Sequence, residues 1–516
     1  MSNYVMAVDI GTTGAKAMVI TVDGRIKGTG YAEYPLQYPE QDAVEVSVDF
    51  LFEQVFSCVR DALASSGVPN TEVVALSFSV QRATFCLLDQ DMRPIDDRFY
   101  VWLDNRAEVV MDEINARMDR DYMFSITGEP ITRTYSVEKL YWLKKFHPDI
   151  YQKAQWFALV DAYAMWVFGA AKFCTETSNA FVSGMMDVRT LEWNDEVMTA
   201  LDLRRDLLPP LVPPGQVVGR VKPEIARLTG LAEGTLIVAG SGDQQAAAMG
   251  AGVIEDGSMS LTLGTVGELV VGLAKPNFAE LVDLMIPSTP ELGIFEIEGN
   301  QISGATCYRW ARDVLCPAEM ALGQAMGRDP FDLMSHYIDQ SRPGSNGVVF
   351  QAALFGTGYP TQDGDATASF VGLSPATTRA DMVRAVMEGV TLESRFIYEA
   401  IKATGVTLKD TITITGGATK SPQWRQIIAD VMNCRIQTLE VSDASLIGVA
   451  ILAAVGAGLV SDTKQGVQQM VRITDSIDPI PANVAVYDQL FEIYRDTYYA
   501  LAKAGVYRKI AKFRRG

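Results

Sequence analysis

Histidine is almost absent from this chain of 516 residues, which contains only His147 and His336. Neither lies in a metal-ligand motif, which argues against a zinc site and against a nucleophilic triad built on an imidazole. The six cysteines are scattered, with no CxxC pair, and are expected to be buried free thiols of a reducing compartment. The chemistry therefore has to rest on carboxylates, amides and backbone groups.

Basic residues are also in deficit, with 44 Lys and Arg against 63 Asp and Glu and a net charge of −19. This balance argues against nucleic acid or an anionic membrane as the main partner. The longest apolar run, residues 446–460, falls short of the roughly 20 residues that span a bilayer and predicts a buried helix. The N-terminus lacks the basic segment and the uninterrupted apolar core of a signal peptide, so a cytoplasmic location is expected.

A chain of this length is too long for one ordinary hydrophobic core, and two large domains are the default expectation. We place the boundary near residues 250–256, which predicts an N-terminal domain over 1–252 and a C-terminal domain over 253–516. A cleft between two such domains would be the natural ligand site.

Two similar strand–GTxG–strand patterns occur about half a chain apart. Residues 5–8 and 17–20 flank the first turn, and residues 258–263 and 268–271 flank the second, Gly264 to Gly267. The recurrence suggests an internal duplication with one unit in each domain. Either turn alone could be only a tight hairpin.

The functional interpretation of both turns is a clamp for phosphate groups, because glycines let the backbone approach and threonine hydroxyls face phosphate oxygens. In the first turn Asp9 would help to hold Mg²⁺, and Lys16 would add a positive charge. Two such hairpins facing each other would cradle a triphosphate. The candidate phosphate-binding residues are Thr12, Thr13, Lys16, Gly264 and Thr265.

A third glycine turn follows the predicted strand 411–415. Gly416 and Gly417 lead to Ser421, a predicted N-cap, and to a helix whose apolar residues recur at i, i+3, i+4 and i+7. A lone glycine pair is commonly just a turn. Beside two phosphate hairpins it also suits an adenosine site.

Asp243 lies among small residues in the segment GSGDQQAA. It could simply cap the helix predicted to begin at Gln244. Its functional interpretation is a general base that accepts the proton of an attacking hydroxyl in phosphoryl transfer, with Gln244 hydrogen-bonding the substrate.

Polar and aromatic groups also follow two predicted strands, in Gln81-Arg82 and in the segment WLDNR at residues 102–106. Surface salt bridges would explain the arginines without any function. Aromatic faces with amides and carboxylates are, however, typical of sites for hydroxylated carbons.

Taken in order, these segments resemble the FGGY carbohydrate kinases over nearly the whole chain. The matching segments are DIGTTGAKA, QRATFCLLDQDMRPI, VWLDNR, TSNA, GDQQAA, GTVGELV, MEGV and GGATKSPQWRQIIADV. The resemblance implies an α/β fold of two actin-like ATPase (ribonuclease H-like) domains that close on ATP and a sugar.

The resemblance also implies roles for single residues. Asp243 falls at the family's catalytic base, and Asp9 with Asp243 at the Mg²⁺ site. The residues that fall around the substrate are Gln81, Arg82, Ala83, Asp104 and Gln244. Those that fall on the nucleotide are Thr12, Thr13, Lys16, Gly264, Thr265, Gly304, Gly417 and Ser421.

Three departures bear on the substrate. Ala83 stands where glycerol kinases carry glutamate, and Arg82-Ala83 stands where xylulokinases commonly show Met-His. Gly358 precedes Tyr359-Pro360 where the family often has arginine before the proline. Substrate identity therefore does not transfer with the resemblance.

The resemblance predicts ATP- and Mg²⁺-dependent phosphorylation of a small sugar or polyol, most simply a ketopentose such as xylulose or a related polyol. A homodimer is the expected assembly. One alternative is an ATP-driven, chaperone-like or regulatory switch on the same fold, and a second is a sugar sensor without catalysis. The substrate-facing segments argue against the first, and retention of Asp9, Asp243 and both GT loops argues against the second.

Overall fold

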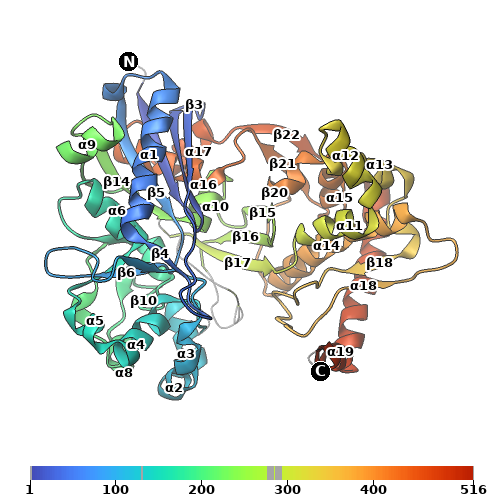
Figure 1. Cartoon of the computed structure of the whole chain (residues 1–516). Helices are drawn as coiled ribbons and strands as arrows, with labels where there is room; N and C mark the ends of the chain where they lie inside the picture. The colour runs from blue at the N-terminus through green and yellow to red at the C-terminus, as the bar shows by residue number, and fades with distance from the viewer. Residues whose placement is uncertain (1–2, 129–131, 276–283, 285–292, 515–516) are drawn as a thin grey trace. The chain divides into compact units, whose positions relative to one another are not determined.

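The computed structural model describes residues 3–128, 132–275, 284 and 293–514, which pack as two compact units (Figure 1). Unit 1 comprises residues 1–254, 274–296 and 443–472. Unit 2 comprises residues 255–273, 297–442 and 473–516. These packing units are less continuous than the predicted domains 1–252 and 253–516, because residues 443–472 return to unit 1.

The centre of unit 1 is a six-stranded sheet with the order β13-β14-β5-β1-β2-β3. Its strands are β1 (Tyr4–Ile10), β2 (Gly14–Thr21), β3 (Ile26–Glu33), β5 (Val73–Val80), β13 (Val217–Arg220) and β14 (Leu236–Gly242). The three strands β1, β5 and β14 run parallel, so their carboxyl ends lie at one edge of the sheet. β1 also pairs antiparallel with β2, across the first glycine turn.

Helices cover this sheet. They are α1 (Val48–Ser66), α6 (Val160–Phe168), α9 (Pro223–Thr229), α10 (Asp243–Gly250), α16 (Ala444–Gly456) and α17 (Thr463–Met470). In α1 the Ser47 hydroxyl accepts from the Phe50 N–H as N-cap, and Leu51, Val55 and Val59 bury one face of the helix.

The return segment explains the discontinuity of unit 1. Helix α16 is apolar on nearly all sides and packs against β1, β5, β14 and α10. In Figure 1 its orange ribbon lies among the blue strands of unit 1. The helix predicted from the apolar run at 446–460 is therefore confirmed, and its burial inside unit 1 supplies apolar surface to that core.

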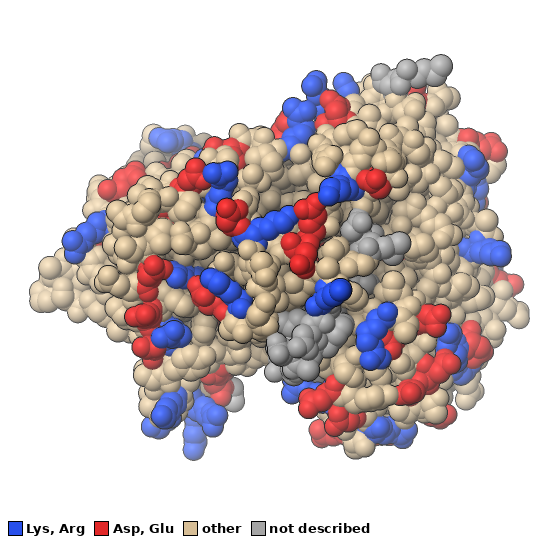
Figure 2. Space-filling model, turned by 180° about the vertical axis from the view of Figure 1, so that it is seen from behind, with Lys and Arg blue, Asp and Glu red and all other residues tan. Residues whose placement is uncertain are grey.

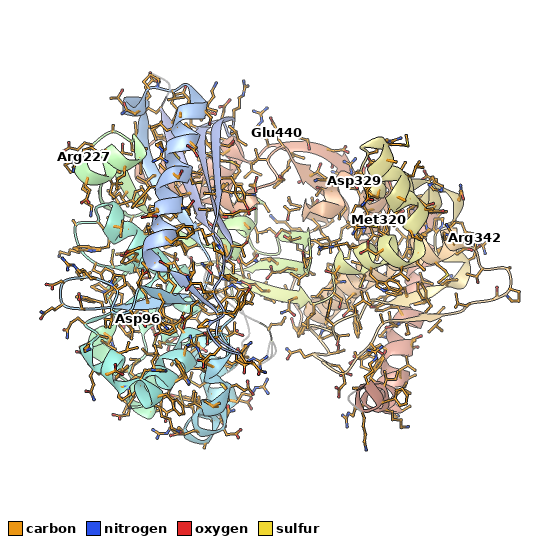
Figure 3. The ribbon with its side chains drawn as sticks, in the orientation of Figure 1. Asp96, Arg227, Met320, Asp329, Arg342 and Glu440 are labelled. Atoms are coloured by element: carbon orange, nitrogen blue, oxygen red, sulfur yellow. The ribbon has the colours of Figure 1, made fainter. Side chains whose placement is uncertain are left out.

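Unit 1 has a second core around a four-stranded sheet with the order β4-β7-β6-β8. The strands are β4 (Glu45–Ser47), β6 (Phe85–Leu88), β7 (Arg98–Tyr100) and β8 (Trp156–Leu159). The helices beside it are α2 (Met111–Arg117), α3 (Arg120–Thr127), α4 (Ser136–Phe146), α5 (Pro148–Lys153), α7 (Thr177–Phe181) and α8 (Asp195–Ala200). Two strand pairs in unit 1 are shorter still: β9 (Thr175–Glu176) with β12 (Leu211–Val212), and β10 (Met186–Asp187) with β11 (Glu192–Trp193). Asp96, labelled in Figure 3, accepts a 2.7 Å hydrogen bond from the Tyr100 hydroxyl at the edge of this sheet.

Unit 2 is built on a six-stranded sheet with the order β17-β16-β15-β20-β21-β22. Its strands are β15 (Met259–Leu263), β16 (Gly267–Leu273), β17 (Phe295–Gln301), β20 (Thr411–Gly416), β21 (Arg435–Leu439) and β22 (Ile473–Ile477), and β18 (Val349–Gln351) pairs separately with β19 (Ser369–Val371). β15 is antiparallel to β16 and parallel to β20, and β20 is parallel to β21. This repeats the pattern around β1, β2, β5 and β14 and confirms the duplication predicted from the two GT loops.

The helices of unit 2 are α11 (Thr306–Leu315), α12 (Pro317–Met326), α13 (Pro330–Gln340), α14 (Arg379–Ala403), α15 (Pro422–Met432), α18 (Pro481–Lys503) and α19 (Val506–Arg514). Five of these helices begin with a capping side chain or with a proline in the first turn. Asp329, labelled in Figure 3, caps α13 by accepting the Phe331 N–H at 2.9 Å, and Pro330 occupies the first turn. Ser421 caps α15 in the same way, as predicted, by accepting the Trp424 N–H.

One face of the protein is mixed in charge, and the cysteines are in the state that the sequence predicts. On the face shown in Figure 2, basic and acidic side chains lie interspersed in small groups. All six cysteines are buried free thiols. Among the helices of the described residues, none combines the length and the apolarity that a bilayer crossing requires.

Candidate active site

Asp9 lies near the carboxyl end of the central strand β1. Its Oδ1 accepts a 2.6 Å hydrogen bond from the hydroxyl of Ser79, its register partner on β5. Burial raises the pKa of the Asp9 carboxyl to about 7, although the Ser79 hydrogen bond opposes the rise. The negative charges of Asp243 and Asp443 raise this pKa further, and Lys16 lowers it. Asp9 is thus the centre of a small group of acids in unit 1 that would favour a cation.

Asp243 stands at the first position of α10, directly after β14. Its Oδ1 accepts the Gln244 N–H at 2.9 Å and lies 3.4 Å from Nε of Arg82, while 35% of the side chain stays exposed. Asp9 lies near the end of β1, and Arg82 and Asp243 follow β5 and β14, so three neighbouring parallel strands gather these residues at one edge of the sheet. Ligands in α/β folds bind beyond this edge.

The first GT loop is braced by its surroundings in unit 1. The Gly11 N–H donates to the Gly14 carbonyl at 3.0 Å, and the Gln81 amide donates to the Gly11 carbonyl at 3.1 Å. The indole N–H of Trp102 donates to the Thr12 hydroxyl at 2.9 Å. Thr13 is exposed beside Thr12. The loop is therefore held from behind while its threonines face outward.

Lys16, the predicted phosphate-binding lysine, forms a 2.7 Å ion pair with Asp443. Asp443 precedes α16 as its N-cap residue, yet its side chain makes no capping hydrogen bond and reaches the lysine instead. The sequence interpretation missed Asp443. The available signal was an acidic residue at the start of the long apolar helix, but only the packing of α16 on β1 brings it to Lys16.

Two of the predicted substrate residues lie inside unit 1 with their polar atoms already bonded. Gln81 is 1% exposed, and besides its bond to the first loop it accepts the Thr84 hydroxyl at 3.1 Å. Asp104 is also 1% exposed; its carboxylate accepts the Val44 N–H at 2.9 Å and Arg106 Nη2 at 2.7 Å. Both side chains support the loops around the site, and direct contact with substrate stays a prediction for each.

The other predicted substrate residues differ in position. Ala83 is buried with a positive φ of 56°, and its carbonyl accepts the Ser136 hydroxyl at 3.1 Å. Gln244 is half-buried next to Asp243 on α10. Arg82 lies between Gln81 and Ala83 in sequence, and its guanidinium lies beside the carboxylate of Asp243, the candidate base. Arg106 does form salt bridges, with Asp104 and Glu45, but these side chains are largely buried, so the pairs do not lie on the surface as the salt-bridge interpretation of the sequence supposed.

The second GT loop is braced within unit 2. The Ala305 N–H donates to the Gly264 carbonyl at 2.8 Å, and the Thr306 hydroxyl donates to the Thr265 carbonyl at 2.7 Å. The Thr265 hydroxyl accepts from Arg309 at 3.1 Å, a cation that the sequence interpretation missed. Gly304 lies so close to the second GT loop that a Cβ on this residue would stand 2.4 Å from the Val266 carbonyl carbon.

The glycine pair of unit 2 adjoins this loop. Leu263 of β15 pairs with Gly416 of β20, which has a φ of 82°, a conformation that favours glycine. A Cβ on Gly417, by contrast, would meet no described atom beyond its chain neighbours closer than the Leu263 carbonyl oxygen at 3.9 Å. Ser421 follows as the N-cap of α15, with its hydroxyl turned to its own helix. The structure thus brings together four of the five nucleotide positions predicted in unit 2, Gly264, Thr265, Gly304 and Gly417, around one end of this sheet.

The carboxylates of Asp9 and Asp243 suit Mg²⁺. Within the described ranges no group of three or more His, Cys, Asp and Glu side chains is arranged to hold a metal. Mg²⁺ commonly takes one or two carboxylates and completes its shell with water and substrate phosphates. Asp9 and Asp243, which lie within electrostatic range of each other, could supply the one or two carboxylates of that pattern.

Comparisons with known proteins agree with this arrangement. The description "FGGY family of carbohydrate kinases, N-terminal domain" matches residues 4–250, and its C-terminal counterpart matches residues 259–457. A gluconokinase of Bacillus licheniformis is 26% identical over 100% of this chain and 99% of its own length. A xylulose kinase of Bacillus subtilis is 25% identical over 96% of each chain.

The fold has a counterpart among solved structures. A gluconate kinase from Lactobacillus acidophilus superposes with a TM-score of 0.87 at 24% identity, over 97% of this chain and 99% of that one. Together with the two matched domains, this likeness confirms the predicted α/β fold of two actin-like ATPase domains.

Proposed function

Because this chain belongs to the FGGY family of carbohydrate kinases, and is thus an ATP-dependent sugar kinase, we propose that Asp243 is the general base of its phosphoryl transfer. The acceptor is a hydroxyl of a small sugar or polyol. The observation that carries the proposal is the position of Asp243. It lies at the carboxyl edge of the parallel strands of unit 1, partly exposed, with Arg82 at 3.4 Å and within electrostatic range of Asp9.

In the proposed reaction the substrate hydroxyl oxygen attacks the γ-phosphorus of ATP in line with the departing ADP oxygen. The Asp243 carboxylate takes the hydroxyl proton as the new P–O bond forms, and the P–O bond to ADP breaks. The products are a phosphate ester and ADP. Arg82 holds positive charge beside the reacting oxygen, which stabilises the developing negative charge.

Asp9 and Asp243 would hold Mg²⁺, which when bound offsets the negative charge of the β- and γ-phosphates. The GT loop of each unit contributes backbone N–H groups and threonine hydroxyls to ATP binding. Lys16 supplies a further positive charge from unit 1, and the Asp443 carboxylate orients it. Support for the loop roles comes from the bracing of both turns, which leaves Thr12, Thr13 and Thr265 at their tips.

For the acceptor we propose a ketopentose such as xylulose, or a related polyol. A relative named xylulose kinase matches almost end to end, and Ala83 removes the carboxylate expected for glycerol. An aldonate such as gluconate is the second candidate. It is favoured by the relative named gluconokinase and by the Arg82 guanidinium, which could pair with a substrate carboxylate.

The test of the acceptor is a coupled ADP-release assay with MgATP against pentuloses, hexuloses, aldonates, pentitols, tetritols and glycerol. Strong stimulation by xylulose or a related polyol supports the first candidate, and stimulation by gluconate alone favours the second. Steady ADP release indifferent to every compound would support the switch-like alternative and contradict acceptor phosphorylation.

The test of the base is Asp243→Asn. The amide keeps the size of the side chain but cannot accept the proton, so turnover should fall by about 10²–10⁴-fold. ATP affinity, measured by calorimetric titration, should change little in comparison. Retention of substantial phosphorylation by this variant would remove Asp243 from the base role.

The setting of the enzyme is inferred from its chemistry. Six buried free thiols support the predicted cytoplasmic location. The homodimer stays a prediction to be checked by the mass of the protein in solution.

A further inference from the structure

Two carboxylates lie buried in unit 1, near the residues that precede the candidate base Asp243. Asp161 of α6 is 1% exposed, and Glu176 of β9 has no exposed surface. Burial raises the pKa of both groups, and the hydrogen bonds made to them oppose the rise. In the described part of the chain their donors are hydroxyls, backbone N–H groups and an amide. Such a network is costly to bury unless each oxygen has partners.

The oxygens of the pair are all bonded. Asp161 accepts the Thr175 hydroxyl at 2.8 and 2.9 Å, the Glu176 N–H at 2.9 Å and the Asn179 amide at 2.6 Å. Glu176 accepts the Ser178 N–H at 2.7 Å through Oε2. Its Oε1 accepts the Ser178 hydroxyl at 2.9 Å and the Asn179 N–H. Both oxygens of Glu176 therefore receive at least one donor.

The hydrogen bonds continue from Glu176 toward Asp243. The Ser178 hydroxyl, which contacts Glu176 Oε1, also shares a 2.8 Å hydrogen bond with the Ser241 hydroxyl and accepts the Gly242 N–H at 3.3 Å. Ser241 and Gly242 are the last two residues of β14, and Asp243 follows immediately.

We propose that Ser178, oriented by the Glu176 carboxylate, is a positioning residue for the general base. Its hydroxyl is hydrogen-bonded to the side chain of Ser241 and to the backbone N–H of Gly242, the two residues before Asp243. These bonds hold the end of β14 in place and thereby orient the Asp243 carboxylate. The inference rests on the proposed role of Asp243 as base. Its consequence is that losing the Ser178 hydroxyl should disturb the chemical step more than substrate or nucleotide binding.

The test compares Ser178→Ala with Thr175→Val. Each change removes one buried hydroxyl that donates to a buried carboxylate, and each leaves that carboxylate other donors. The Ser178 hydroxyl is hydrogen-bonded to the two residues before Asp243, whereas the Thr175 hydroxyl is bonded to Asp161. We expect kcat to fall about 10- to 100-fold in Ser178→Ala, since a displacement near 1 Å at a reacting group costs about that much. The KM for ATP and for sugar should stay within about twofold, and Thr175→Val should keep nearly full kcat.

Equal loss of kcat in the two variants, per mole of folded protein, would overturn the proposal, since the network would then act only through stability. If Ser178→Ala does not fold, Ser241→Ala replaces it in the test. Ser241→Ala loses one of the two hydrogen bonds to Ser178, so kcat should fall by a smaller factor. A wild-type kcat in this variant would overturn the proposal. Asp243→Asn in the same assay separates the two ideas. An active Asp243→Asn refutes the base itself, whereas an inactive one with unchanged Ser178→Ala refutes only the positioning role.

Discussion

Gly304→Ala offers a severe test of the nucleotide side of the site, because the structure gives the size of the disturbance. The added Cβ would lie 2.4 Å from the Val266 carbonyl carbon and 2.6 Å from the Gly267 nitrogen. Ordinary van der Waals contact begins near 3.4 Å, so the two backbone segments must separate by about 1 Å. Neither neighbour is a flexible side chain. The second GT loop therefore has to move.

A 1 Å displacement of a positioning group costs about 100-fold in rate, equivalent to about 2.7 kcal/mol of transition-state stabilisation. We expect kcat/KM for ATP to fall by that factor in Gly304→Ala. The affinity for sugar measured without nucleotide should be preserved. The assay is initial rate against MgATP at saturating sugar, with circular dichroism to show that the variant is folded.

The matched control is Gly364→Ala, also in unit 2. In the part of the chain that the structure describes, a Cβ at Gly364 would meet nothing within 4 Å besides its chain neighbours, so this variant should keep wild-type kinetics. A folded Gly304→Ala enzyme whose kcat/KM for ATP stays within threefold of that control would refute the assignment of the second GT loop to ATP.

Two further predictions concern unit 2. Gly417→Ala should leave stability unchanged, because among the described residues beyond its chain neighbours its Cβ would meet only the Leu263 oxygen, at 3.9 Å. If nucleotide lies against this glycine, the KM for ATP should rise at least tenfold. An unchanged KM would show that the space beside this glycine is empty in the working enzyme. Burial raises the pKa of Glu393 from 4.5 to about 7, although the Tyr494 hydroxyl donates to it at 2.5 Å and opposes the rise. The folded state therefore holds a proton that the unfolded state releases, so the stability of unit 2 falls as the pH rises from 4.5 to 7, by about 3 kcal/mol in total. Glu393→Gln keeps an acceptor for Tyr494 without the charge, and urea unfolding should show it more stable than wild type at pH 8 but not at pH 4.5; an equal difference at both pH values would contradict this.

Much of the site could be predicted because its signals are local. A GT turn between two apolar runs is visible within about fifteen residues, and the same holds for Ser421 before its helix. Hydrogen bonds inside such turns and caps join residues three or four positions apart. Their sequence pattern therefore carries nearly all the information that forms them.

Side-chain orientation could not be predicted in the same way. Asp104 and Gln81 are predicted to lie around the substrate, which stays a prediction, but only the structure shows that Arg106 and the Gly11 carbonyl engage them inside unit 1. A polar residue after a strand has the same sequence pattern whether it faces ligand or braces a loop. The choice depends on partners supplied by other segments.

The sequence by itself thus determined the duplicated architecture, the two GT loops, the glycine pair and the position of Asp243 in the chain. Only the tertiary structure decided which groups surround them. Asp443 reaches Lys16 across 427 positions of sequence, and Ser178 reaches Ser241 across 63. Those contacts form because the return segment and the second core of unit 1 bury apolar surface against the central sheet. That driving force is non-directional, so a local pattern cannot specify which polar groups it brings together.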